Sequence, residues 1–396
     1  MSQPNVIILL IVIATAVALV TRRVPVPYTA ALVLTGIALA ALHLVEAPHL
    51  TRELLFAVFL PGLVFEAAFH LSYDDLRQNA RAIAALAIPG VAVNIAITAA
   101  ILMASRALFG TSLELGWRQA LTFAAIVAAT DPIAVVALMR SLGAPRRLSL
   151  LLEAESLLND GTAIIFFGLV LAATAGTAIG GLALTVDFFR IVVVGTVVGL
   201  AVGAAASRLT RVVDEAVIEI TLTVIAAYGS FVLADQVRGS GVIATVVAGV
   251  IYGNHGLRSG MSASTRAAAQ SFWDYVAFLL NSIVFLLIGF AVQLPSLLHH
   301  VPLVVAALLA GWIARGVIVG GVATALAMTS ERIPRAWVVP LIWGGLRGGL
   351  AMVLALSLPA DFIGRDLVIT ATFGVVLVSI LLQGTTMAPL LRRTRV

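Results

Sequence analysis

The sequence contains no cysteine and little charge, and both absences narrow the classes of protein that it can encode. Without cysteine, a disulfide, a thiolate metal site and a cysteine nucleophile are all excluded. Charged residues make up only 11% of the 396 residues, whereas 61% are hydrophobic. A soluble domain carries about 25% charged residues, so this chain has too little polar surface to cover a globule in water.

Long apolar runs dominate the chain from Val6 to Pro389. Each run of about twenty residues can cross a bilayer core about 30 Å thick. The first run, Val6 to Val20, lacks the basic region and small-residue cleavage site of a signal peptide, so we expect it to be a span. Polar breaks between the runs predict thirteen helices, near residues 5–21, 27–45, 53–71, 82–105, 117–140, 148–175, 188–207, 214–235, 239–253, 271–293, 301–328, 336–358 and 367–390.

The distribution of arginine predicts how these helices are oriented. All 24 basic residues are arginine, and the net charge of +5 could suggest a nucleic-acid partner. The arginines lie in short loops between apolar runs, however, which is typical of membrane proteins and not of a nucleic-acid interface. With the N-terminus outside and the C-terminus inside, sixteen arginines fall in inner loops or the tail and five in outer loops. This skew supports an odd number of spans with the C-terminus in the cytosol. We expect a multi-pass protein of the cell membrane, specifically of a prokaryotic inner or plasma membrane.

We therefore predict an all-α polytopic membrane protein, with residues 1–396 forming a single transmembrane domain and no soluble regulatory domain. Two apolar segments are interrupted in their middles, the fifth at Ala129–Pro132 and the twelfth at Gly344–Gly349. Because they are seven helices apart, they run in opposite directions through the membrane. Interrupted helices in matching positions of two inverted halves, here about 5–175 and 214–390, indicate a transporter binding site. Simple helix kinks are the alternative.

Charges inside the apolar segments are candidates for function. A charge at the bilayer midplane costs at least about 2.5–3.5 kcal/mol, so each one needs a partner or a role. Five residues meet this description: Glu66, Asp131, Glu155, Asp160 and Arg347.

Asp131 lies at the first interruption, between Thr130 and Pro132. Proline removes a backbone donor, which leaves carbonyl groups nearby without partners. The carbonyl of Thr130 is thus suited to a small hard cation. Asp131 could bind the cation or offset the positive end of the half-helix that follows, and we favour the second role.

The sixth segment places four polar residues on one helical face. At about 100° per residue, Glu155, Asn159, Ser156 and Asp160 span an arc of about 140°. Two carboxylates, an amide and a hydroxyl are hard oxygen ligands, which suit sodium or a proton and not a soft transition metal. A polar network that only fixes helix packing is the alternative.

Arg347 requires a buried anion, for which Glu155 and Asp131 are candidates, and we expect it to pair with Glu155. Asp160 would then be the carboxylate that is free to exchange ligands. Desolvation favours the protonated form of such a group, so that it can alternate between a proton and a cation. Glu66 could face the same cavity and bind the ion, or serve packing alone.

Arg315 in the eleventh segment could form a separate structural ion pair with Glu219 in the eighth.

Together these motifs resemble the NhaP/NHE-type sodium/proton antiporter family. Each motif alone is weak, but their order and spacing along nearly the whole chain are specific. The resemblance rests on Thr130–Pro132, Glu155–Gly161 and Gly344–Gly348, with Phe65–Glu66, Gly239–Ala244, Gly253–Asn254, Asn281–Ser282 and Phe285.

The resemblance implies a homodimer of thirteen-helix protomers in the lipid bilayer, in which a core domain moves against a dimerisation domain. It implies that Na⁺ and H⁺ are the substrates and that no cofactor is bound. The ion would be held by the Thr130 carbonyl, Ser156, Asp160 and Glu66. Asp131, Asn159 and the Glu155–Arg347 pair would support this site.

The Asn159–Asp160 pair is similar to the electroneutral branch of the family, in which one carboxylate carries either one sodium ion or one proton. The expected mechanism is alternating access with competition at Asp160. A K⁺-selective or broad-selectivity exchanger, with K⁺ or Li⁺ as substrate, is the nearest alternative, and a cation channel is more remote. An enzyme is not expected, because an intramembrane aspartyl protease would carry Tyr-Asp and Gly-x-Gly-Asp motifs that Asp131 and Asp160 lack, and no G-x-S-x-G or H-E-x-x-H is present.

Overall fold

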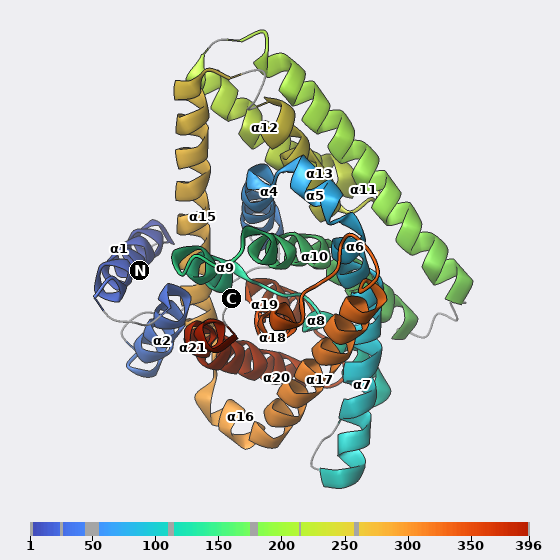
Figure 1. Cartoon of the computed structure of the whole chain (residues 1–396). Coiled ribbons are helices and arrows are strands. Elements are labelled where there is room, and N and C mark those ends of the chain that lie inside the picture. The colour runs from blue at the N-terminus through green and yellow to red at the C-terminus, as the bar shows by residue number, and fades with distance from the viewer. Residues whose placement is uncertain are drawn as a thin grey trace. The chain divides into compact units, whose positions relative to one another are not determined.

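The computed structural model describes residues 3–23, 27–43, 55–109, 115–174, 181–213, 215–256 and 261–394. Every regular element within these ranges is a helix, as Figure 1 shows, and this confirms the predicted all-α fold. Among the described residues, seven helices are long and apolar enough to cross a membrane, and three shorter apolar helices accompany them. Each of the thirteen predicted segments contains helix; the number of crossings and the orientation of the termini stay predictions.

By internal packing the chain divides into two compact units, which we describe separately. Unit 1 comprises Met1–Leu50, Arg81–Thr174 and Ser282–Val396, and unit 2 comprises Thr51–Ala80 and Ala175–Asn281. Each unit is thus built from segments that are far apart in the sequence, and one boundary between the units falls within helix α15 (Ala263–Ala291).

In unit 2 the backbones of two helices, α11 (Gly181–Thr210) and α13 (Gly241–Ile251), approach closely. The elements of this unit are η1 (Leu55–Phe59), α4 (Leu60–His70), α5 (Tyr73–Gln78), α11, α12 (Ala216–Gln236), α13, η3 (Tyr252–Gly256) and the first part of α15. A Cβ atom at Gly199 of α11 would lie 2.4 Å from the carbonyl oxygen of Ala244 in α13, so glycine is required for this contact. Aromatic residues fill the core, with the rings of Phe65 and Trp273 4.8 Å apart.

Unit 1 contains both interrupted helices. Its elements are α1 (Gln3–Thr21), α2 (Tyr28–Ala41), α6 (Ala80–Ala87), α7 (Pro89–Phe109), α8 (Trp117–Ile126), α9 (Ile133–Ser141), α10 (Arg146–Thr174), the end of α15, α16 (Leu294–His299), α17 (Val301–Ala325), α18 (Arg335–Trp343), α19 (Gly349–Leu356), α20 (Arg365–Val378), η4 (Ser379–Gln383) and α21 (Gly384–Thr394). Residues 127–132 separate α8 from α9, and residues 344–348 separate α18 from α19. Both predicted interruptions are therefore confirmed. They are full breaks in the helix and not kinks.

Candidate functional site

The two breaks of unit 1 meet each other. The backbone N–H of Asp131 in the first break donates to the carbonyl of Leu346 in the second, with an N–O distance of 2.8 Å. A Cβ atom at Gly348 would lie 2.2 Å from the Cβ atom of Asp131, so a side chain there would separate the two segments. Glycine at position 348 is thus explained by the close approach of the two breaks.

Donor groups lie just beyond the carboxyl end of α8 (Trp117–Ile126), at the start of the first break. The Arg347 guanidinium donates through Nη1 to the carbonyls of Ala128 at 3.0 Å and Ala129 at 3.3 Å. The Asn159 amide nitrogen also donates to Ala128, at 3.1 Å. A helix end carries partial negative charge on its unsatisfied carbonyls, so a buried cation is stabilised there without a carboxylate partner.

Asp131 lies at the opposite kind of helix end. Its Oδ1 accepts a hydrogen bond from the backbone N–H of Ile133 at 3.1 Å, at the start of α9. The backbone N–H of Gly349, at the start of α19, also bonds to this carboxylate. One negative group therefore faces the positive ends of two half-helices, which fits the supporting role expected for Asp131.

Glu155 pairs with Arg315, and the expected pair with Arg347 is wrong. The two nitrogens of the Arg315 guanidinium donate to the two oxygens of Glu155, one of them at 2.8 Å, in a bidentate ion pair. Both side chains are buried. Arg315 also donates to the carbonyl of Leu341 in α18, at 3.0 and 3.2 Å from Nη2 and Nε.

The physical reason is that two guanidinium groups reach the site, that of Arg315 from α17 and that of Arg347 from the second break, and carbonyls of the first break bind the guanidinium of Arg347. The suggested pair of Arg315 with Glu219 is likewise replaced, because the donors of Arg315 are directed at Glu155 and Leu341. Glu219 belongs to α12 in unit 2.

Asp160 differs from the other charged groups of unit 1. Its Oδ1 is buried, and within the described residues no donor bonds to it. The residue as a whole is partly exposed. Oδ1 of the neighbouring Asn159 is also buried and has no donor in the described part of the chain.

Ser156 and Thr130 complete this cluster. The Ser156 hydroxyl donates to the backbone carbonyl of Thr130, and the Asn159 amide lies 3.3 Å from the Thr130 hydroxyl. Ser156, Asn159 and Asp160 come from one face of α10, as predicted, and Thr130 comes from the first break. We refer to Thr130, Ser156, Asn159 and Asp160 as the oxygen cluster. It offers carboxylate, carbonyl, hydroxyl and amide oxygens, which are the ligands of a hard cation.

Glu66, the fourth predicted ion ligand, belongs to α4 in unit 2. Its Oε1 lies 3.4 Å from Nδ1 of His70, and Nε2 of His70 lies 3.7 Å from Oδ1 of Asp274. Sequence reasoning missed His70 and Asp274. The four-residue spacing of Glu66 and His70, which places both on one helical face, was the available signal.

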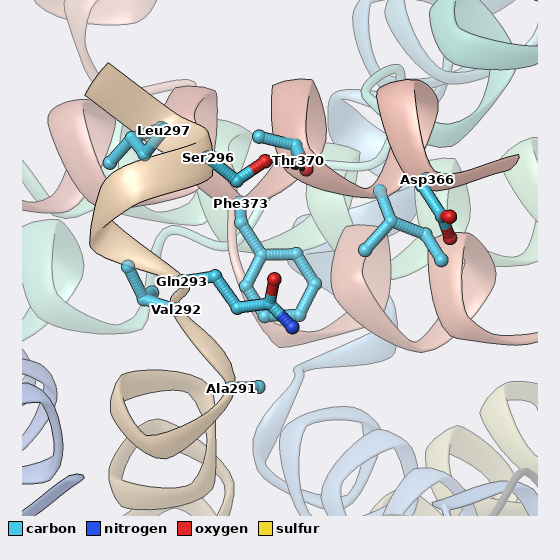
Figure 2. Close-up of a pocket in the computed structure, with 9 residues that line it drawn as sticks. Ala291, Val292, Gln293, Ser296, Leu297, Asp366, Thr370 and Phe373 are labelled. Carbon is cyan, nitrogen blue, oxygen red and sulfur yellow. Dashed lines mark hydrogen bonds between the residues drawn. The ribbon is translucent and has the colours of Figure 1, made fainter. Parts of the chain in front are cut away.

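The pocket shown in Figure 2 lies elsewhere in unit 1. It has a volume of about 330 Å³ and lies between α16 and α20. The ring of Phe373 and the side chain of Gln293 line it, and Ser296 and Thr370 approach each other to 3.2 Å. It shares no residue with the oxygen cluster, so the candidate ion site is a packed group of ligands and not this cavity.

Comparisons with known proteins agree on one family. The model of the family described as "Sodium/hydrogen exchanger, transmembrane" matches residues 7–393. The low-affinity Na⁺/H⁺ antiporter NhaS1 of Synechocystis is 38% identical over 94% of this chain and 71% of its own length. The Na⁺/H⁺ antiporter NhaH of Halobacillus dabanensis is 33% identical over 98% of this chain and 96% of its own length.

A solved structure has the same fold. The sodium proton antiporter MjNhaP1 of Methanocaldococcus jannaschii, determined at pH 8, superposes with a TM-score of 0.80 over 98% of both chains. Its sequence identity is 19%, so this likeness concerns the fold alone.

Proposed function

Because the chain belongs to the sodium/hydrogen exchanger family of membrane transporters, we propose that it exchanges Na⁺ for H⁺ by alternating access, with both ions competing for Asp160. Members of this family are antiporters and not enzymes, so the protease alternative is dropped. The proposal goes beyond family membership in naming the group at which the two ions compete and the charge that each carries across the membrane.

One observation carries the proposal: the Asp160 carboxylate has a buried oxygen to which no described donor bonds. A buried carboxylate oxygen without a donor is costly, and either a proton or a bound cation removes that cost. The two solutions exclude each other, since a protonated carboxyl no longer neutralises a cation. Binding of one ion therefore favours release of the other.

The other charges of the site explain why one exchanging group is enough. Glu155 is neutralised by Arg315, Arg347 donates to two carbonyls of the first break, and Asp131 faces two helix amino ends. Asn159 is neutral at the position where an additional carboxylate would carry a second charge. With one free carboxylate, each half-cycle moves either one Na⁺ or one H⁺, which makes the exchange electroneutral with a 1:1 ratio.

We assign the ion ligands to Asp160, Ser156, the Thr130 carbonyl and Glu66, with Na⁺ as substrate. Ser156 and Thr130 are already joined by a hydrogen bond, so only a small rearrangement is required for both oxygens to face a cation. Asp131, Asn159, Glu155 and Arg347 would hold these ligands in place. We further propose that the protein is a homodimer with inverted halves, about 5–175 and 214–390, in which a core domain moves against a dimerisation domain during the cycle.

The test is cation-driven proton movement in inverted membrane vesicles, followed with a pH-sensitive dye. Na⁺, Li⁺ and K⁺ are added in turn to wild type, Asp160→Asn and Glu153→Gln. Glu153 is the matched control, because it lies on the same helix but is paired at the surface with Arg140 at 2.7 Å.

We expect Asp160→Asn to lose exchange by about 100-fold or more, because a neutral amide can neither release a proton nor neutralise a cation in a site of low dielectric. Glu153→Gln should retain exchange. Wild-type rates in Asp160→Asn would contradict the assignment. In proteoliposomes, an exchange rate that changes with an imposed membrane potential would contradict electroneutrality.

A further inference from the structure

The second break opens a helical hydrogen bond, and two side chains join its separated ends. In a continuous helix the N–H of Arg347 would donate to the carbonyl of Trp343, four residues earlier. Here the N–H of Arg347 donates to the hydroxyl of Ser379 at 3.0 Å. That hydroxyl donates to Oε1 of Gln383 at 2.6 Å, and Nε2 of Gln383 donates to the carbonyl of Trp343 at 2.9 Å. We call Ser379 and Gln383 the bridging pair.

The bridging pair has a backbone suited to this task. Ser379 and Gln383 are the first and last residues of the π-helical turn η4, which joins α20 to α21, and both are buried. A hydroxyl can donate and accept at once, and a primary amide offers one acceptor oxygen and a donor nitrogen. The pair therefore satisfies one donor and one acceptor of the break and leaves none of the bridging atoms without a partner. Single π-helical turns within α-helices often occur at functional sites.

Arg347, whose backbone N–H is bound by the bridging pair, contacts the backbone next to the oxygen cluster. Arg347, held through its backbone by Ser379, donates through its side chain to the carbonyls of Ala128 and Ala129. The next carbonyl along the chain is that of Thr130, which we assign as an ion ligand. A displacement of the Arg347 backbone therefore moves the group that holds the end of α8, and with it the Thr130 carbonyl.

We propose that Ser379 and Gln383 are positioning residues for transport, which hold the second break open and so set the geometry of the Thr130 carbonyl. This inference rests on the proposed function and deepens it by naming groups that act on the ion site from a third helix. Without the bridge, the N–H of Arg347 and the carbonyl of Trp343 either remain buried without partners or bond to each other. The second outcome extends α18 by one turn and draws Arg347 away from α8.

The test compares Ser379→Ala and Ser379→Cys with Thr372→Ala in proteoliposomes. Thr372 is a matched control because it is fully buried in α20, yet its hydroxyl bonds only to the carbonyl of Val368 in its own helix, at 2.8 Å. We expect Ser379→Ala to raise the KM for Na⁺ about tenfold, the effect of one lost buried hydrogen bond, with the maximal rate within about twofold of wild type. The thiol of Ser379→Cys is similar in size to the hydroxyl but is a weaker donor and acceptor. The KM for Na⁺ of Ser379→Cys should therefore lie between the values of wild type and Ser379→Ala.

Thr372→Ala should leave the KM unchanged. An unchanged KM in Ser379→Ala, or an equal rise in Thr372→Ala, would overturn the proposal. If Ser379→Ala does not accumulate in the membrane, the KM of Ser379→Cys is compared with that of Thr372→Ala instead, and an unchanged KM in Ser379→Cys would overturn the proposal.

Hydrogen–deuterium exchange separates this inference from the proposed function, because it requires no transport. Peptides that cover 127–132 should exchange deuterium faster in Ser379→Ala and Ser379→Cys than in wild type or Thr372→Ala. Peptides that cover 343–349 should change their exchange rate as well, to a faster rate if the two backbone groups stay without partners and to a slower rate if α18 extends. If wild-type protein transported no cation in exchange for protons, the proposed function would be wrong. The hydrogen–deuterium exchange of the variants would still show whether the bridging pair holds the break. Identical exchange in all variants would show that the bridging pair does not hold the break.

Discussion

Glu155 and Asp160 are two carboxylates of the same helix, five residues apart, in opposite states. Glu155 receives a bidentate pair from Arg315 and is fully enclosed, whereas Oδ1 of Asp160 is buried and no described group donates to it. A group whose partners are all supplied by the protein is held in one state, and a group that lacks one can exchange small ions. In this account Glu155 has a structural role in the site, whereas Asp160 binds and releases the transported ions.

The largest expected effect tests the structural side of this comparison. Glu155→Gln should destabilise the protein by about 3–5 kcal/mol, because it leaves the Arg315 charge buried without its partner. The measurement is the apparent unfolding temperature of purified protein.

A double-mutant cycle with Arg315→Gln provides the control. The second substitution should recover part of the loss, and the same cycle with Arg347→Gln should show a smaller coupling. Stronger coupling of Glu155 to Arg347 than to Arg315 would show that the pairing described here is wrong.

Asp160→Asn tests the other side. It should abolish exchange while the unfolding temperature stays the same or rises, since it removes a buried charge that lacks a donor. Activity and unfolding measured on one preparation would check this contrast with Glu155→Gln. A large loss of stability in Asp160→Asn would mean that the two carboxylates play the same role.

Ser156→Ala should have an intermediate effect. It removes one proposed ion ligand and the donor to the Thr130 carbonyl, so we expect the KM for Na⁺ to rise about tenfold. Initial rates over a range of Na⁺ concentrations measure this. An effect on the maximal rate alone would place Ser156 outside the ligand set.

Glu153→Gln should have the smallest effect and sets the baseline for the helix. Its partner Arg140 is mostly exposed, and surface ion pairs contribute about 0–1 kcal/mol. Transport and unfolding temperature should both match wild type. If Glu153→Gln lost exchange, the distinction among the acids of α10 would no longer hold.

The fold and part of the site could be predicted because they depend on local rules. Apolar runs located the helices, proline and glycine located both breaks, and helical periodicity placed Ser156, Asn159 and Asp160 on one face. The position of Asp131 before a half-helix could be predicted in the same way, and its carboxylate accepts a hydrogen bond from the start of α9; its role in transport stays a prediction. None of these inferences requires knowledge of how distant segments pack.

The incorrect pairing shows where such rules end. Arg315 and Arg347 both lie in apolar segments, and nothing in the sequence gives the depth of α17 relative to α10. We also expected a carboxylate for Arg347, although the carbonyls at a helix end stabilise a cation as well. The bridging pair was missed for a related reason: Ser379 and Gln383 stand four residues apart in an apolar run, but their partners lie in another segment.

Proton release on cation binding tests the central claim most directly. Na⁺ is added to purified, weakly buffered protein in the absence of transport, and the protons released per bound Na⁺ are counted with a pH indicator at several pH values. We expect a ratio that approaches one toward acidic pH and falls toward alkaline pH, and no release in Asp160→Asn. Binding of Na⁺ to wild type without proton release at any pH would contradict competition at a single carboxylate.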